Sequence, residues 1–166
     1  MLAALLAAAV AVVTDVRSRR IPNALTFGAA AAGLVFALAT QGVSGLGIAA
    51  AGWLTGAALF FPFFALRGMG AGDVKLLAAI GAWLGPSQVL WVGIFAAMAG
   101  GVLAIVVSLV RGYLKTAFTN VWLIFTHWRV VGLQPVPGLT LTDTRAPRLA
   151  YAVPVAVGLV VTLWRR

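Results

Sequence analysis

The chain has 166 residues and a formal net charge of +9, and 63% of its residues are hydrophobic whereas 9% are charged. This composition excludes a soluble domain with a polar surface, and at roughly 20 apolar residues per span it predicts one all-α membrane domain over residues 1–166, a bundle of about six transmembrane helices. No cysteine is present and the single histidine, His127, cannot form a metal site alone, so no metal or other cofactor is predicted.

The first apolar run covers residues 2–14, which as a helix at 1.5 Å per residue is only about 20 Å long. A span must therefore continue through Asp15, which places this acid at the edge of the membrane. Arginines follow, and Pro22 and Asn23 then mark the start of a new helix. Proline disfavours a helix in the residue before it and suits the first turn of the next helix.

The remaining apolar runs predict five more spans, with an uncharged turn over residues 40–45 between the first two of them. Two of these spans contain small residues at four-residue spacing, which allows helices to approach closely in lipid. These residues are Gly52 and Gly56 in one span and Gly93, Ala97 and Gly101 in the other. The five spans cover residues 23–40, 46–66, 76–84, 88–110 and 149–164.

A polar connection, residues 112–148, precedes the last span. Aromatic residues recur in it at helical spacing, which predicts a helix lying in the membrane interface. They are Phe118, Trp122 and Phe125, with Trp128 close by. His127 is predicted to be an interfacial neighbour of these rings, and Asp143 is predicted to be a helix cap or a solvated charge.

The twelve Lys and Arg residues lie in short segments between the apolar runs. This distribution favours a role in topology and contact with anionic membrane lipid over a nucleic-acid partner. The segments after the first, third and fifth spans are basic and those after the second and fourth are not, so the basic segments are predicted to face the cytoplasm. Arg165 and Arg166 then end on the outer side, which disagrees with this rule.

Two of the three carboxylates in the chain, Asp15 and Asp73, lie where apolar runs end. The chain crosses the membrane twice between them, so both are predicted to lie on the cytoplasmic side. If they face each other in a poorly solvated site they share a proton, and the ionised acid is able to activate a water while the protonated acid polarises a peptide carbonyl. The alternative is that each acid caps a helix or pairs with a nearby base, such as Arg17 or Lys75.

A glycine-rich segment, Gly68-Met69-Gly70-Ala71-Gly72, directly precedes Asp73 and lacks the Lys-Ser/Thr of a nucleotide-binding loop. Gly70 and Gly72 are predicted to let backbone approach closely and to adopt conformations closed to other residues, so that an extended substrate strand can lie there. Lys75 either tunes Asp73 or anchors the chain at the membrane interface, and the anchor is the commoner role.

Two segments together resemble the type IV prepilin peptidases, intramembrane aspartic proteases of the GxGD type. They are Asp15-Val16-Arg17-Ser18-Arg19-Arg20-Ile21-Pro22-Asn23 and Gly70-Ala71-Gly72-Asp73-Val74-Lys75-Leu76. The resemblance covers residues 1–110 and, more weakly, the segment Tyr151-Ala152-Val153-Pro154 and Gly158. It implies a catalytic pair, Asp15 and Asp73, that cleaves a prepilin or pseudopilin precursor at the cytoplasmic face of the bacterial inner membrane. The residues that it implies for shaping the site or binding substrate are Pro22, Asn23, Gly70, Gly72 and Lys75.

Larger members of that family carry an N-terminal region with paired cysteines and methylate the new pilin terminus with S-adenosylmethionine. The present chain has no room for that region and no cysteine. It resembles the short form associated with tight-adherence, Flp-type pili, and we expect peptidase activity without methyltransferase activity.

Two other classes of protein fit the same aspartates. A small proton-coupled transporter titrates such groups during transport, and a non-catalytic subunit of a pilus or secretion assembly depends on neither of them individually. The glycine-rich segment before Asp73 favours the protease, since a subunit that only packs has no need of it.

Overall fold

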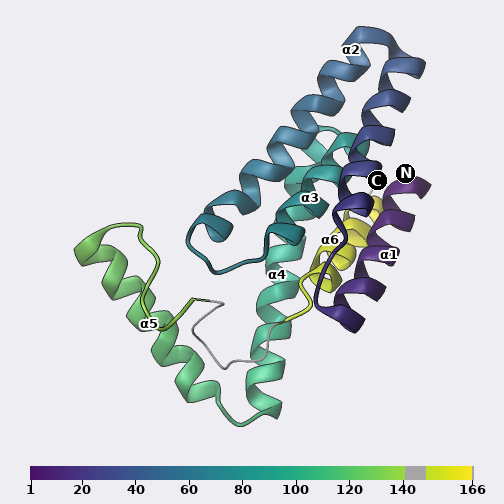
Figure 1. Ribbon diagram of the computed structural model, residues 1–166. Helices are drawn as coiled ribbons and strands as arrows, with labels where there is room; N and C mark the ends of the chain where they lie inside the picture. The colour runs from purple at the N-terminus through teal and green to yellow at the C-terminus, as the bar shows by residue number, and fades with distance from the viewer. Residues whose placement is uncertain (141–148, 166) are drawn as a thin grey trace.

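The computed structural model describes residues 1–140 and 149–165, and all regular structure within these residues is helical (Figure 1). The predicted all-α fold is thereby confirmed. The helices are α1 (Leu2–Ser18), α2 (Asn23–Ala65), α3 (Ala71–Leu84), α4 (Pro86–Val110), α5 (Leu114–Val131) and α6 (Ala152–Trp164). Asp143, predicted to be a cap or a solvated charge, lies outside the described residues.

Helix α2 consists of two limbs that meet at Gly42, where the backbone has φ 66° and ψ −156°. This positive φ favours glycine because a side chain is strained there. In Figure 1 the limbs run in opposite directions from a turn at the top of the view. The turn predicted over residues 40–45 is therefore present, as a sharp break with helix on both sides, and the two limbs correspond to the second and third predicted spans.

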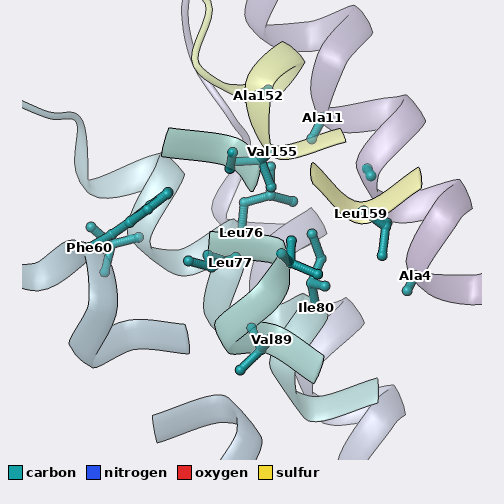
Figure 2. Packing of buried hydrophobic residues seen from close by; sticks show 14 residues of the cluster. Ala4, Ala11, Phe60, Leu76, Leu77, Ile80, Val89, Ala152, Val155 and Leu159 are labelled. Carbon is teal, nitrogen blue, oxygen red and sulfur yellow. The ribbon is translucent and has the colours of Figure 1, made fainter. Parts of the chain in front are cut away.

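Helix α3 occupies the middle of the bundle, and residues 76–82 are all buried. A helix that is apolar on every side is stable when other elements surround it, which explains why these short apolar turns persist here. Figure 2 shows the large α3 side chains at the centre of the core, between Phe60 of α2 and Leu159 of α6. They are Leu76, Leu77 and Ile80.

Glycines let α2 lie directly against α3. A Cβ atom on Gly52 collides with the backbone of Gly81, and one on Gly56 lies 2.5 Å from the carbonyl oxygen of Leu77. Close backbone approach through small residues is the usual way in which helices associate in lipid. The close contact predicted for Gly52 and Gly56 is confirmed.

On α4 the small residues that meet α6 are Ala96 and Gly100, and the predicted Ala97 and Gly101 face outward. A Cβ on Gly158 of α6 lies 2.7 Å from the Ala96 nitrogen, whereas a Cβ on Gly101 has nothing within 4 Å. The prediction is wrong at Ala97 and Gly101. Residues three apart and residues four apart on a helix share a face, so four-residue spacing alone does not tell which of two neighbouring faces is the buried one. The face of α4 that is buried contains Val89, Val92, Gly93, Ala96 and Gly100.

Helix α5 stands apart from the other helices in Figure 1, and none of its residues is buried. It contains the predicted aromatic series, of which Phe118 and Trp122 are 63% and 66% exposed. The helix is confirmed, and its place in a membrane interface stays a prediction.

Two of the described helices, α2 and α4, are long and apolar enough to cross a membrane, and α6 is a shorter apolar helix. These helices agree with a membrane protein, and the number of spans stays a prediction. Arg165, at the end of α6, lies with its guanidinium carbon 4.1 Å from the centre of the Trp91 ring near the start of α4. Because α4 starts where α3 ends, Arg165 lies at the opposite end of the bundle from Asp73. The side of the membrane on which each end lies stays a prediction.

Candidate active site

A cleft of about 380 Å³ opens where the end of α1 meets the starts of α2 and α3. We call it the carboxylate cleft. Its lining includes every site residue that the sequence predicts, although these residues come from two distant segments of the chain. They are Asp15, Pro22, Asn23, Gly70, Gly72, Asp73 and Lys75, and Arg19, Arg20, Ile21 and Ala71 also line the cleft.

Asp15 lies in the last turn of α1, and only 7% of its surface is exposed. The helix ends just beyond it, because Arg19 adopts a left-handed conformation with φ 54° and its N–H donates to the Asp15 carbonyl oxygen over 2.8 Å. The carboxylate is held by a distant part of the chain: its Oδ2 accepts the backbone N–H of Ala152, at the start of α6, over 3.2 Å. This bond satisfies a buried acceptor and fixes the direction of the Asp15 side chain.

Asp73 lies in the first turn of α3, and Gly70 precedes that helix in an extended conformation. The Asp73 N–H donates to the Gly70 carbonyl oxygen over 3.2 Å, which closes the turn that leads the chain into α3. The Asp73 carboxyl group interacts electrostatically with that of Asp15. The fold therefore brings the two acids into one cleft.

At Gly70 and Gly72 the lack of a side chain lets neighbouring groups lie close to the main chain at the edge of the cleft. A Cβ on Gly70 lies 3.2 Å from Oδ2 of Asp73, and a Cβ on Gly72 lies 3.2 Å from the Cβ of Ile21. Both distances are tighter than ordinary van der Waals contact. The backbone at Gly70, with φ −76° and ψ 145°, is open to any residue, and Gly72 lies within helix α3 and has no positive φ. The expectation of conformations closed to other residues is therefore wrong at both glycines.

Lys75 joins the start of α3 to the start of α2. Its Nζ donates a hydrogen bond to the side-chain oxygen of Asn23 over 2.9 Å and lies 5.1 Å from the centre of the Phe27 ring. Pro22 adopts an extended conformation and immediately precedes α2, so it sets the position of Asn23. Lys75 thus orders the wall of the cleft through Asn23.

Two contributions from α6 are absent from the predicted site. One is the Ala152 N–H that holds Asp15; a backbone donor leaves no side-chain signal in the sequence. The other is Tyr151, whose hydroxyl group interacts electrostatically with Asp73 and whose ring packs edge to face with Phe60, with centroids 5.7 Å apart. The signal that points to both is the weak family resemblance around the run that begins at Tyr151.

The chemistry open to this arrangement is acid–base chemistry on a bound substrate. Two interacting carboxyl groups at a cleft that admits water supply an acid and a base together, provided that one of them holds a proton. Within the described residues no group of three or more His, Cys, Asp or Glu side chains is placed to hold a metal ion.

One comparison with known proteins gives a match. The model of a family described as the type IV leader peptidase family matches residues 2–105, a segment that contains both aspartates and all of the described residues that line the carboxylate cleft. No curated protein and no solved structure matches the chain.

Proposed function

Because the chain belongs to the type IV leader peptidase family, we propose that it is an aspartic endopeptidase that removes the leader from Flp-type prepilins or related pseudopilins. Its place is the bacterial inner membrane, which it crosses several times with the carboxylate cleft facing the cytoplasm. The observation that carries this proposal is the meeting of Asp15 and Asp73 in one cleft, from the ends of two helices that are far apart in sequence.

Hydrolysis by this pair needs one ionised and one protonated carboxyl group. The ionised acid takes a proton from a water as that water attacks the scissile carbonyl carbon, and the protonated acid donates to the carbonyl oxygen. The tetrahedral intermediate then collapses as a proton passes to the leaving amine. No covalent bond forms between enzyme and substrate, so neither aspartate needs to be a nucleophile.

Gly70 and Gly72 lie beside the acids at the wall of the cleft. We propose that the extended leader junction lies along this wall, within reach of the two acids. A prepilin also has an apolar helix after its leader, and this helix packs beside the bundle in the membrane. Helix packing then supplies the binding and the aspartates supply the chemistry.

We propose that the protein has no methyltransferase activity. The 166 residues contain no cysteine, whereas the resemblance assigns paired cysteines to the region of larger members that accompanies methylation. Purified protein incubated with prepilin and S-adenosylmethionine is expected to release an unmethylated mature terminus. A methylated terminus in the mass spectrum contradicts this part of the proposal.

The test of the peptidase is co-expression with an Flp-type prepilin, with leader removal followed by gel shift and N-terminal sequencing. Asp15→Asn and Asp73→Asn are each expected to reduce the cleavage rate at least about 100-fold, since one general acid or base contributes about 10²- to 10⁴-fold. Asp143→Asn, the same change at the remaining acidic residue, is the matched control and is expected to cleave normally.

The outcomes separate the classes of protein. Loss in both single variants with a normal control supports the aspartic dyad and removes the transporter and the packing subunit. Cleavage that persists in both variants shows that the carboxylates are structural and overturns the proposed mechanism.

A further inference from the structure

We propose that Tyr151 is a positioning residue of this active site: its ring is a wedge between α2 and α4 that fixes the start of α6, so that the Ala152 amide holds Asp15 opposite Asp73. The proposal deepens the proposed function and rests on it for its kinetic test. It also makes a structural claim that is measurable without any substrate.

The ring of Tyr151 has a shaped seat. On one side it meets Phe60, a core residue that is 3% exposed, edge to face at an interplanar angle of 77°. On the other side it lies against Gly100 of α4, where an added Cβ falls 2.7 Å from the Tyr151 hydroxyl oxygen, 2.8 Å from Cε2 and 2.9 Å from Cζ. Glycine at position 100 therefore makes room for this ring.

The position of the Tyr151 ring determines the position of the next residue, Ala152. Ala152 follows Tyr151 directly, has no exposed surface, and donates its N–H to Oδ2 of Asp15 over 3.2 Å. Further along α6, Gly158 packs against the backbone of α4 at Val92 and Ala96. The position of α6 is thus fixed at two points, Gly158 and the Tyr151 ring. Of the two, the Tyr151 ring is the one adjacent to the residue that binds the Asp15 carboxylate.

Positioning, and not direct chemistry, is the role that fits this geometry. Tyr151 is absent from the described residues that line the carboxylate cleft, although its hydroxyl group interacts electrostatically with Asp73. Its ring contacts Phe60 and Gly100, both outside the cleft. A displacement of this ring moves the Ala152 donor and with it the Asp15 side chain.

The kinetic test uses purified protein in detergent and a prepilin substrate, with four variants. Tyr151→Ala removes the wedge, and Gly100→Ala pushes it out of its seat. Both are expected to lower kcat about 10- to 100-fold with little change in KM, because a misplacement near 1 Å costs about 100-fold in rate. Tyr151→Phe keeps the ring and is expected to stay within about threefold of the wild-type kcat, since only the hydroxyl group is lost.

Gly101→Ala is the matched control for Gly100→Ala. It adds the same methyl group one position along the same helix, where nothing lies within 4 Å, and is expected to behave as wild type. Wild-type kcat in both Tyr151→Ala and Gly100→Ala overturns the proposal. So does a Tyr151→Phe variant that loses as much activity as Tyr151→Ala, because the hydroxyl group is then chemically required.

Hydrogen–deuterium exchange tests the structural claim without substrate. The amides at the start of α6 are expected to exchange faster in Gly100→Ala than in Gly101→Ala, because the bond from Ala152 to Asp15 is weakened. Unchanged exchange in Gly100→Ala overturns the wedge even if no precursor is ever cleaved. If exchange changes as expected but wild-type protein cleaves no prepilin, the wedge stands and the proposed function fails. Since Gly100→Ala leaves Tyr151 itself intact, the test remains decisive if Tyr151→Ala does not fold.

Discussion

Helices α3 and α5 are similar in length, 14 and 18 residues, and are held in opposite ways. Helix α3 is enclosed on all sides, and its backbone touches that of α2 through Gly52 and Gly81. Helix α5 carries bulky aromatic residues, and none of its residues is buried. The large rings of this part of the chain therefore lie where the protein packs least.

The comparison shows how the site is held in place. The carboxylate cleft lies at the start of α3. The position of Asp73 therefore depends on the glycine contacts that hold α3 against α2. Helix α5 contributes no residue to the lining of that cleft among the residues that the structure describes. Close packing through small residues thus fixes the positions of the two acids. The aromatic face of α5 is exposed and is available to contact whatever surrounds the protein.

Among the glycine substitutions, the largest effect is expected where two backbones touch. Gly52→Ala places a methyl group against the backbone of Gly81, and no rotation of a flexible side chain relieves the clash. Overpacking usually costs about 1–3 kcal/mol, and here we expect a loss in the free energy of unfolding at the upper end, about 3 kcal/mol or more, because α2 and α3 must separate. Thermal unfolding in detergent measures it.

Gly47→Ala is the control for this change. It lies on the same limb of α2, and its added Cβ has nothing within 4 Å. We expect its melting temperature to equal or slightly exceed that of wild type, since alanine favours a helix over glycine by about 1 kcal/mol. Equal destabilisation by both variants refutes the view that backbone contact fixes α3.

A smaller effect, on activity more than on stability, is expected at the edge of the cleft. Gly72→Ala brings a methyl group to 3.2 Å from the Cβ of Ile21, so the segment before Pro22 must shift by a few tenths of an ångström. We expect the cleavage rate to fall about 3- to 10-fold, less than the loss of about 100-fold that a misplacement of 1 Å causes. Initial rates on prepilin measure this.

Gly68→Ala serves as its control, because the added Cβ meets only the Phe63 carbonyl oxygen, at an ordinary 3.5 Å. Its rate is expected to match that of wild type. A Gly68→Ala variant as slow as Gly72→Ala indicates that the glycine-rich segment matters through its flexibility and not through the space beside Ile21.

Much of this site is predictable from the sequence because its ionisable side chains are easily recognised in an apolar chain. Asp15 and Asp73 are conspicuous in a chain with three carboxylates, and counting the spans between them places both on one side. The break at Gly42 is equally visible, since uncharged small residues interrupt two apolar runs. The residues of the cleft follow from the two segments that contain these acids.

The parts that sequence reasoning misses depend on backbone and on helix rotation. The donor that holds Asp15 is the Ala152 N–H, and any residue except proline offers the same group. The choice between Gly100 and Gly101 is a matter of which face of α4 meets α6, and both glycines satisfy a search for small residues. Only the three-dimensional packing distinguishes them.

The smallest effect is expected on α5. Trp122→Ala removes a large ring that is 66% exposed, and we expect the free energy of unfolding in detergent to change by no more than about 0.5 kcal/mol. Phe60→Ala is the contrasting variant, because this ring is 3% exposed and its loss from the core is expected to cost about 3–5 kcal/mol. If thermal unfolding shows that Trp122→Ala is as harmful as Phe60→Ala, α5 is held by the protein after all. A large difference leaves the rings of α5 free to contact the membrane interface, as their spacing predicts.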